Sequence, residues 1–361
     1  MSDVGRDDAR ARRRSPAGPV LATAAHLSDA PPPADDFVYA RFGTPTTAAL
    51  EDGLGALHGT GPAVAFPSGT AALDGLLEAL LHPGDRLVVP ADGYAGTRAL
   101  AAGWSRWGVQ VDEVATPALA GADLDAAVVV LETPSNPYGD VCDVAEVCRR
   151  AHASGAVVVA DVTTLTPLGA PWHDLGVDAT SCADTKFTAG HSEVLAGHVA
   201  SRDDDLLARV REGRTRRGSV PGSADAWSVL RGLATLEVRL ARVATSAVQV
   251  AESLAHHPAL GLVRHPALPD DPSADVHRAQ ARWGGPVVTL ELEDRAAAQA
   301  VVAALRVVVE ATSFGGVRST VDRRERWDPT LPGGLLRLSV GLEDPDVLTG
   351  DLLQALDVLR R

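Results

Sequence analysis

The stretch AAVVVLETP (126–134) is a short apolar run that ends in polar residues. Runs of Val, Ala and Leu without polar alternation are typical of strands covered on both faces. Further runs of strand length are RLVVPA (86–91), VQVDEV (109–114), AVVVADVT (156–163) and, more weakly, EVLAGHVAS (193–201). Because helix-length segments separate these runs, we expect an α/β fold with a mostly parallel sheet and right-handed crossovers.

The pattern changes in the last third of the chain. Residues 224–257 contain no proline or other helix stop, which predicts one long helix. Beyond it we expect, in order, a strand (285–293), a helix (295–306), two strands (about 307–313 and 335–340) and a helix (344–360). We therefore predict three parts: a disordered tail and N-terminal arm (1–45), an α/β domain (46–245) and a small α+β domain (246–361).

Composition excludes several classes of function. The 361 residues carry 33 Lys and Arg against 47 Asp and Glu, a net charge of −14. A nucleic acid or an anionic membrane would favour a basic face, so we expect neither as a partner. No apolar run approaches the length of a membrane span. The three cysteines form no CxxC pair, which indicates a reducing compartment and predicts a cytoplasmic protein. We predict no metal site.

Lys186 is the only lysine in the sequence, and all the other residues counted as Lys or Arg are arginines. A lysine amine can form a Schiff base with a carbonyl, whereas the guanidinium of arginine stays protonated. ETPSNP (132–137) and Asp161 lie at or just after predicted strand ends, and Lys186 lies shortly after a further short segment, DATSCAD (178–184). The carboxyl ends of parallel strands meet at one edge of a sheet, so we expect these residues to share a crevice.

The carbonyl partner of Lys186 could belong to a substrate or to pyridoxal phosphate (PLP). PLP needs an acidic partner for its ring nitrogen, and Asp161 is the candidate. It also needs a phosphate site, which PSGTAAL (67–73) could supply as a small-residue turn at a helix N-terminus. These residues favour PLP over a Schiff-base enzyme without cofactor, which would need neither feature.

Nine segments in sequence order resemble the PLP-dependent trans-sulfuration enzymes of cysteine and methionine metabolism. They are YARFGTPTTAALEDGLGALHG, SGTAAL, YAGT, ETPSNP, VADVTTLTP, TKFTAGHSEVLAG, GLATLEVRL, SFGGVRS and LLRLSVGLED. The resemblance runs from about residue 37 to the end of the chain. It implies the type I PLP fold of aminotransferases, in which 46–245 is the PLP-binding domain.

The resemblance also implies site residues. The catalytic residues would be Lys186, which holds PLP covalently and moves protons, and Tyr94, which stacks on the ring. The cofactor-binding residues would be Tyr39, Arg41, Ser68, Gly69, Thr70, Tyr94, Asp161, Thr163, Thr185 and Lys186. Tyr39 and Arg41 would reach the phosphate of a neighbouring subunit, so we expect a homodimer at least, and a tetramer. The substrate-binding residues would be Asn136, Ser313, Arg337 and Arg318.

The activity implied is γ-elimination from cystathionine, giving cysteine, 2-oxobutanoate and ammonia. Cystathionine γ-synthase, acting on an O-acylhomoserine, and methionine γ-lyase are the close alternatives; a silent PLP-binding regulatory protein is an alternative of another class. Three positions depart from the family pattern. Ala183 replaces a phosphate-binding Ser, Asp184 puts a carboxylate near the phosphate, and Arg318 replaces a Glu associated with the distal end of the substrate.

Overall fold

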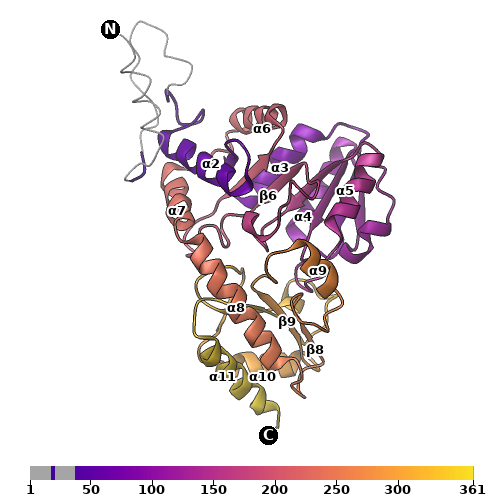
Figure 1. Cartoon of the computed structure of the whole chain (residues 1–361), viewed down its shortest axis with the longest axis vertical. Helices are drawn as coiled ribbons and strands as arrows, with labels where there is room; N and C mark the ends of the chain where they lie inside the picture. The colour runs from indigo at the N-terminus through magenta and orange to yellow at the C-terminus, as the bar shows by residue number, and fades with distance from the viewer. Residues whose placement is uncertain (1–17, 21–36, 361) are drawn as a thin grey trace, which may run out of the picture.

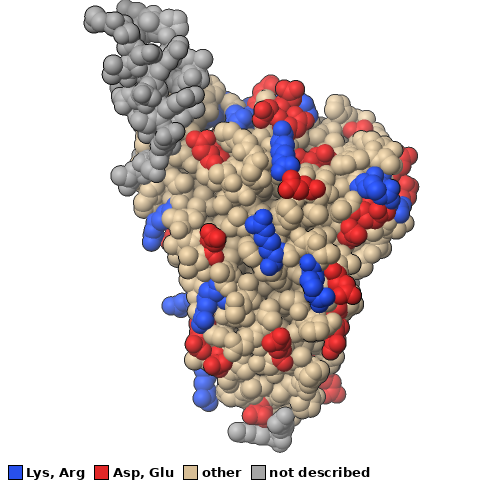
Figure 2. Space-filling model, viewed as in Figure 1, with Lys and Arg blue, Asp and Glu red and all other residues tan. Residues whose placement is uncertain are grey.

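The computed structural model describes residues 18–20 and 37–360. Most of the predicted tail, residues 1–17 and 21–36, lies outside the described residues. Within them, no helix combines the length and the apolar character that crossing a membrane requires. Figure 2 shows acidic and basic side chains interspersed over one face of the molecule.

A seven-stranded sheet forms the centre of the larger part of the molecule. Its strands are β1 (Val64–Phe66), β2 (Arg86–Pro90), β3 (Gln110–Val114), β4 (Val128–Glu132), β5 (Val157–Asp161), β6 (Ala179–Cys182) and β7 (Gly197–Ser201). They lie in the order β1-β7-β6-β5-β4-β2-β3. The five strands from β6 to β3 are parallel, and β7 runs antiparallel to both of its neighbours. The predicted α/β fold with a mostly parallel sheet is confirmed.

Helices cover both faces of this sheet (Figure 1). They are α2 (Pro45–His58), α3 (Gly69–Leu80), α4 (Ala95–Trp104), α5 (Val144–Ala153) and α6 (Asp204–Arg217). Along β4, Val128 and Val130 pack with α3 and α6, whereas Val129 and Leu131 pack with α5. Successive side chains of a strand face opposite sides, so a continuous apolar run is what a doubly covered strand requires.

The smaller part of the molecule is built on a five-stranded sheet in the order β10-β11-β12-β9-β8. Its strands are β8 (Leu262–Arg264), β9 (Val287–Glu291), β10 (Val309–Glu310), β11 (Thr320–Arg323) and β12 (Leu335–Ser339). Helices α8 (Leu236–Leu254), α10 (Arg295–Ala304) and α11 (Pro345–Leu356) pack on it around one apolar core. In Figure 1, α8 runs from the large part into this one, and the short α9 (Ala274–Gln280) lies between the two.

The prediction of a single long helix over 224–257 is wrong. The structure has two helices, α7 (Ser223–Leu233) and α8, with a break between them. The break lies where the helix meets the backbone that follows Lys186. A Cβ on Gly232 would lie 2.5 Å from the carbonyl oxygen of Ala189. Buried Arg239 donates hydrogen bonds to the carbonyls of Phe187, Thr188 and Gly232 (2.6–3.2 Å). A tertiary contact therefore overrides the local helical pattern.

Several short elements escape the sequence pattern. The strands β1, β6, β8 and β11 have three or four residues each, and α9 has seven. Such segments are too short to show a period. The strand expected at about 307–313 is reduced to the two residues of β10. The boundary predicted at 245/246 falls inside α8, which runs through both parts.

Replacement of Arg239 tests whether this side chain holds the α7–α8 break. Arg239→Met leaves three buried carbonyls without their cationic donor, so we expect the free energy of unfolding to fall by about 2–4 kcal/mol. The exposed Arg242, one turn further along α8, is the control. Urea unfolding followed by circular dichroism measures both variants. Equal stability of Arg239→Met and Arg242→Met would contradict the assignment.

Candidate active site

A cavity of about 620 Å³ opens at the carboxyl end of the large sheet, and residues of the small part of the molecule close its other side. Its volume is that of a small-molecule site. Glu132 and Asp161, the last residues of β4 and β5, line the cavity together with Lys186. The predicted convergence of strand ends on one crevice is therefore what the structure shows.

The amine of Lys186 lies between groups of opposite charge. Its Nζ donates a hydrogen bond to Ser313 Oγ (2.7 Å) and lies 5.1 Å from the ring centre of Phe314. Desolvation is the largest effect on its pKa, followed by repulsion from Arg337, and attraction to Asp161 opposes both. The result is a pKa of about 8, so the amine can gain and lose a proton near neutral pH.

Two carboxyl groups lie side by side at the floor of the cavity, because Glu132 and Asp161 are paired in the register of β4 and β5. Asp161 accepts a hydrogen bond from the N–H of Thr163 (2.9 Å), and desolvation raises its pKa. Glu132 accepts from the N–H of Tyr94 (2.6 Å). Its burial, and then the charge of Asp161, raise its pKa well above the usual range. Glu132 stands in the quoted ETPSNP segment, but its role in holding Tyr94 was missed.

The N-terminus of α3 borders the cavity beside the Lys186 turn. Ser68 Oγ accepts from the N–H of Ala71 (3.1 Å) and so caps this helix. A Cβ on Gly69 would lie 2.5 Å from the Cβ of Ala183, which only glycine avoids. Free N–H groups of a first helical turn attract an anion. With Thr70 also lining the cavity, this turn can hold a phosphate.

Two threonines predicted to bind the cofactor line the cavity and fix its backbone. Thr163 Oγ1 accepts from the N–H of Ala183 (2.9 Å). Thr185 Oγ1 accepts from the N–H of Ala196 (3.0 Å) and lies 3.2 Å from the carbonyl oxygen of the same residue. Both hydroxyls therefore already hold the segment that carries Lys186.

Arg337 lies in β12 with 4% of its surface exposed. Its Nη1 donates to Asn136 Oδ1 (3.1 Å) and its Nη2 to the carbonyl of Ser313 (2.8 Å). Desolvation, and then the charge of Arg324, lower its pKa to about 10. Its buried Nε has no hydrogen-bond partner among the described residues. A guanidinium held this way can bind a carboxylate. The predicted substrate residues Asn136, Ser313 and Arg337 are thus brought together.

Next to Arg337, the wall of the cavity contains a second cationic group that sequence reasoning missed. Arg324 Nη1 donates to Asp322 Oδ2 (2.7 Å), and Trp327 Nε1 donates to Asp322 Oδ1 (3.0 Å). Arg337 Nη2 lies 3.5 Å from the same carboxylate. Two guanidinium groups therefore share one carboxylate, which leaves a net positive charge. The segment VDRRERWDP (321–329) carries this wall.

Arg318 is not part of the cavity lining, which corrects the prediction for this residue. Its neighbour Ser319 points inward, where its hydroxyl and N–H donate to the carboxylate of Glu343 (2.8–3.2 Å). Arg318 itself is exposed, in the bend that precedes β11. The arginine of this segment that lines the cavity is Arg324.

Tyr94 lines the cavity at the start of α4. Tyr39 and Arg41 do not line it within this chain: Arg41 Nη1 donates to the carbonyl of Thr215 (3.0 Å), and its guanidinium lies 5.4 Å from the ring centre of Tyr39. Their predicted contact is with a neighbouring subunit, and it stays a prediction.

Comparison with known proteins gives one consistent family. A family model described as "Cys/Met metabolism PLP-dependent enzyme" matches residues 5–357. A Streptomyces coelicolor protein named "Putative cystathionine gamma-lyase" is 44% identical over 347 residues, covering 94% of this chain and 88% of that protein. A cystathionine gamma-synthase of Mycobacterium tuberculosis is 37% identical, covering 89% of this chain and 86% of that protein. The structure of apo CalE6, a methionine gamma lyase from Micromonospora echinospora, superposes with a TM-score of 0.88 at 38% identity, covering 96% of each chain.

Because Lys186 is the only lysine, amine labelling tests its electrostatic environment directly. In protein freed of cofactor, ¹³C reductive methylation should give one lysine signal that titrates near pH 8, against about 10.4 for a solvated lysine. Arg337→Met should raise this midpoint, because it removes a positive charge that disfavours the ammonium form. The surface variant Arg242→Met should leave it unchanged. A wild-type midpoint at the solvated value would contradict the burial of this amine.

Proposed function

The chain belongs to the Cys/Met metabolism family of PLP-dependent enzymes, and on this basis we propose that it cleaves cystathionine by γ-elimination. The products would be cysteine, 2-oxobutanoate and ammonia. The observation that carries the choice of substrate is the pair of arginines, Arg337 and Arg324, that share the carboxylate of Asp322.

The residues around the cavity fit PLP. The turn at Gly69 has no room for a side chain and offers helix N–H groups to a phosphate. Asp161 is the acid for the ring nitrogen, and a cationic ring would offset the desolvation that raises its pKa. Lys186 is the amine to which PLP attaches. When bound, PLP supplies an electron sink for the α-carbon of the amino acid.

Proton movement in this mechanism belongs to Lys186 and Tyr94. A lysine whose pKa is about 8 has a substantial neutral fraction near neutral pH, so it can take the α-proton and then a proton from Cβ, and it can deliver a proton to Cγ once the thiolate has left. Tyr94 is held at the cavity edge because its N–H donates to the buried Glu132. Its ring would stack on the cofactor, and its hydroxyl would assist in moving the proton. Expulsion of the thiolate leaves the four-carbon fragment that becomes 2-oxobutanoate.

The charges of the cavity favour a substrate with two carboxylates. Asp322 neutralises one of the two guanidinium groups, and the remaining positive charge faces the cavity. Arg337, beside Asn136 and Ser313, would hold the α-carboxylate. Arg324 would then hold a carboxylate at the far end. Cystathionine has a carboxylate at each end, whereas methionine has only one.

The runner-up is a γ-synthase reaction on an O-acylhomoserine, because an O-succinyl group also ends in a carboxylate. The names of the relatives span both activities. Methionine γ-lyase is less favoured, since a methyl thioether brings no second carboxylate to Arg324. A silent PLP-binding protein is disfavoured by the presence of both proton-transfer residues, Lys186 and Tyr94.

We also propose that the active site is completed by a second copy of the chain. Tyr39 and Phe42 are large hydrophobic residues with 43% and 56% of their surface exposed, next to Arg41. This supports the role of Tyr39 and Arg41 at a neighbour's phosphate, in a dimer or a tetramer. The three cysteines are buried and free of disulfides, which supports a reducing compartment and so the cytoplasm.

A substrate panel on the PLP-loaded enzyme tests the proposed reaction. With cystathionine we expect 2-oxobutanoate and free cysteine in equal amounts, at a kcat/KM above that for methionine. The measurement is coupled detection of the 2-oxo acid together with thiol titration. If the enzyme turns over only O-acylhomoserines with cysteine, the proposed lyase activity is wrong and the protein is a γ-synthase.

The role of Arg324 is tested by Arg324→Gln. Loss of a charge-assisted hydrogen bond should raise KM for cystathionine about tenfold or more, and should change the affinity for methionine less than about twofold. Arg326→Gln is the matched control, because Arg326 pairs with Glu310 outside the cavity. An equal loss of affinity for both amino acids, or an effect of Arg326→Gln as large as that of Arg324→Gln, would remove Arg324 from the substrate site.

A further inference from the structure

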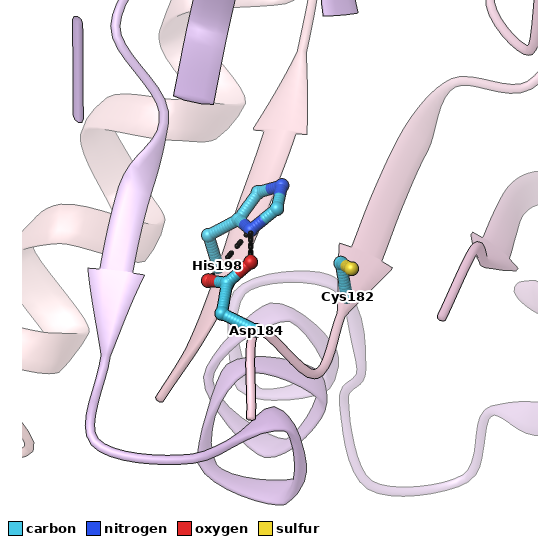
Figure 3. A group of neighbouring side chains, drawn as sticks. All are labelled: Cys182, Asp184 and His198. Carbon is cyan, nitrogen blue, oxygen red and sulfur yellow. Dashed lines mark hydrogen bonds and ion pairs between the residues drawn. The ribbon is translucent and has the colours of Figure 1, made fainter. Parts of the chain in front are cut away.

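A buried chain of four polar side chains lies behind the Lys186 turn. Both carboxylate oxygens of Asp184 lie 2.9 Å from His198 Nδ1, as Figure 3 shows. His198 Nε2 lies 2.7 Å from Nε2 of His58, the last residue of α2. His58 Nδ1 lies 3.1 Å from Thr180 Oγ1 in β6. Asp184 and His198 are 1% and 0% exposed.

The geometry determines how protons are shared along this chain. Two ring nitrogens 2.7 Å apart need one proton between them. The contact with the Asp184 carboxylate requires a proton on His198 Nδ1. Burial, and then the charges of His198 and His173, lower the pKa of His58 well below its usual value, so the ring of His58 stays neutral. Every polar atom of the chain therefore has a partner inside the protein.

These contacts identify the role of the cluster. Cys182, Asp184 and His198 are close enough together to suggest a metal site. However, both nitrogens of His198 are already engaged, and no interaction joins Cys182 to the His198–Asp184 pair in Figure 3; its sulfur lies 3.9 Å from the hydroxyl of Thr188. Burial raises the pKa of the Cys182 thiol well above its usual value, which keeps it a thiol. The pair therefore serves to connect two segments of backbone.

The hydrogen bond between Asp184 and His198 connects the Lys186 turn to the start of β7. This start of β7 contacts both the lysine turn and the phosphate-binding turn. Ala196 and His198 hold Thr185 and Asp184, the two residues before Lys186. Gly197, between them, packs against the phosphate-binding turn: a Cβ there would lie 2.6 Å from backbone atoms of Gly69. Three consecutive residues thus set the distance between the lysine turn and the phosphate turn.

We propose that Asp184 and His198 are positioning residues for Lys186: their hydrogen bond, backed by His58, fixes the lysine turn against β7. The amine thereby keeps its depth in the cavity and its distances from Arg337 and Asp161. The proposal depends on the PLP-dependent chemistry of the family and not on the choice of cystathionine, so it stands or falls separately from the proposed substrate.

The test uses the PLP-loaded enzyme and the pH titration of its visible absorbance, which reports on the nitrogen of Lys186. In Asp184→Ala the turn loses its anchor and the nitrogen becomes more exposed. We expect the titration midpoint to rise, because greater exposure to water favours the protonated, cationic form of the nitrogen. Displacement of the amine should also lower kcat about tenfold, with KM changed less than about twofold. Asp184→Asn keeps an acceptor for His198 Nδ1 and should restore most of both properties.

The control is a second His–Asp pair at the other end of β6. His152 Nε2 lies 2.9 Å from Asp178 Oδ2, and Asp178 immediately precedes the strand. His152→Ala should leave the absorbance titration and kcat at wild-type values. If Asp184→Ala also leaves both values unchanged, the positioning role is wrong.

A fourth variant, with three substitutions, separates positioning from stability. Replacing a buried polar group entirely by apolar residues often preserves the fold. In the triple variant Asp184→Ala, His198→Val, His58→Leu, the hydroxyl of Thr180 keeps the carbonyl of Ala200 as its partner (3.3 Å). We expect the triple variant to unfold at a temperature near that of wild type while its midpoint stays raised and its kcat stays low. Recovery of wild-type midpoint and kcat would show that the chain serves stability alone.

Discussion

The structure depends on keeping one amine, that of Lys186, away from water and between charges of opposite sign. Desolvation and Arg337 disfavour its ammonium form, and Asp161 favours it. The balance holds only while the amine keeps its distances from both groups, because Coulomb energies inside a protein change steeply with separation. This explains why several surrounding residues form hydrogen bonds that fix the backbone around Lys186. Thr163, Thr185 and Arg239 all bond to the segment around Lys186.

The two parts of the molecule contribute different charges to the cavity. Lys186 and the carboxyl groups of Glu132 and Asp161 come from the large sheet, whereas Arg337 and Arg324 come from the segments around β12 and β11. The Arg337–Asn136 hydrogen bond joins the two parts. The attraction of Arg337 lowers the pKa of Glu132, against the larger effect of burial. Docking of the small sheet therefore completes the cavity and also contributes to the electrostatics of its carboxyl floor.

The sequence predicts those parts of the site that follow from strand ends. Asp161 could be placed because the apolar run before it shows the carboxyl edge of a parallel sheet, and Lys186 because it is the only lysine and follows shortly after Asp161 in the chain. The residues on either side of β11 that line the cavity could not be predicted in this way. Arg318 and Arg324 lie six positions apart, and only the structure shows that Arg318 is exposed and that Arg324 lines the cavity. The α7–α8 break could not be predicted either, because it depends on Gly232 meeting a backbone more than 40 residues earlier in the chain.

The departures at Ala183 and Asp184 form one coherent arrangement. Ala183 lies against Gly69 so closely that neither position has space to spare. Asp184 turns its carboxylate away from this contact and into the buried space beside β7, where His198 receives it. A carboxylate so placed adds no negative charge to the phosphate turn, and it adds an anchor to the lysine turn. Asp184 departs from the family pattern in sequence. In the folded protein its carboxylate is compensated by His198, which lies 14 residues further along the chain.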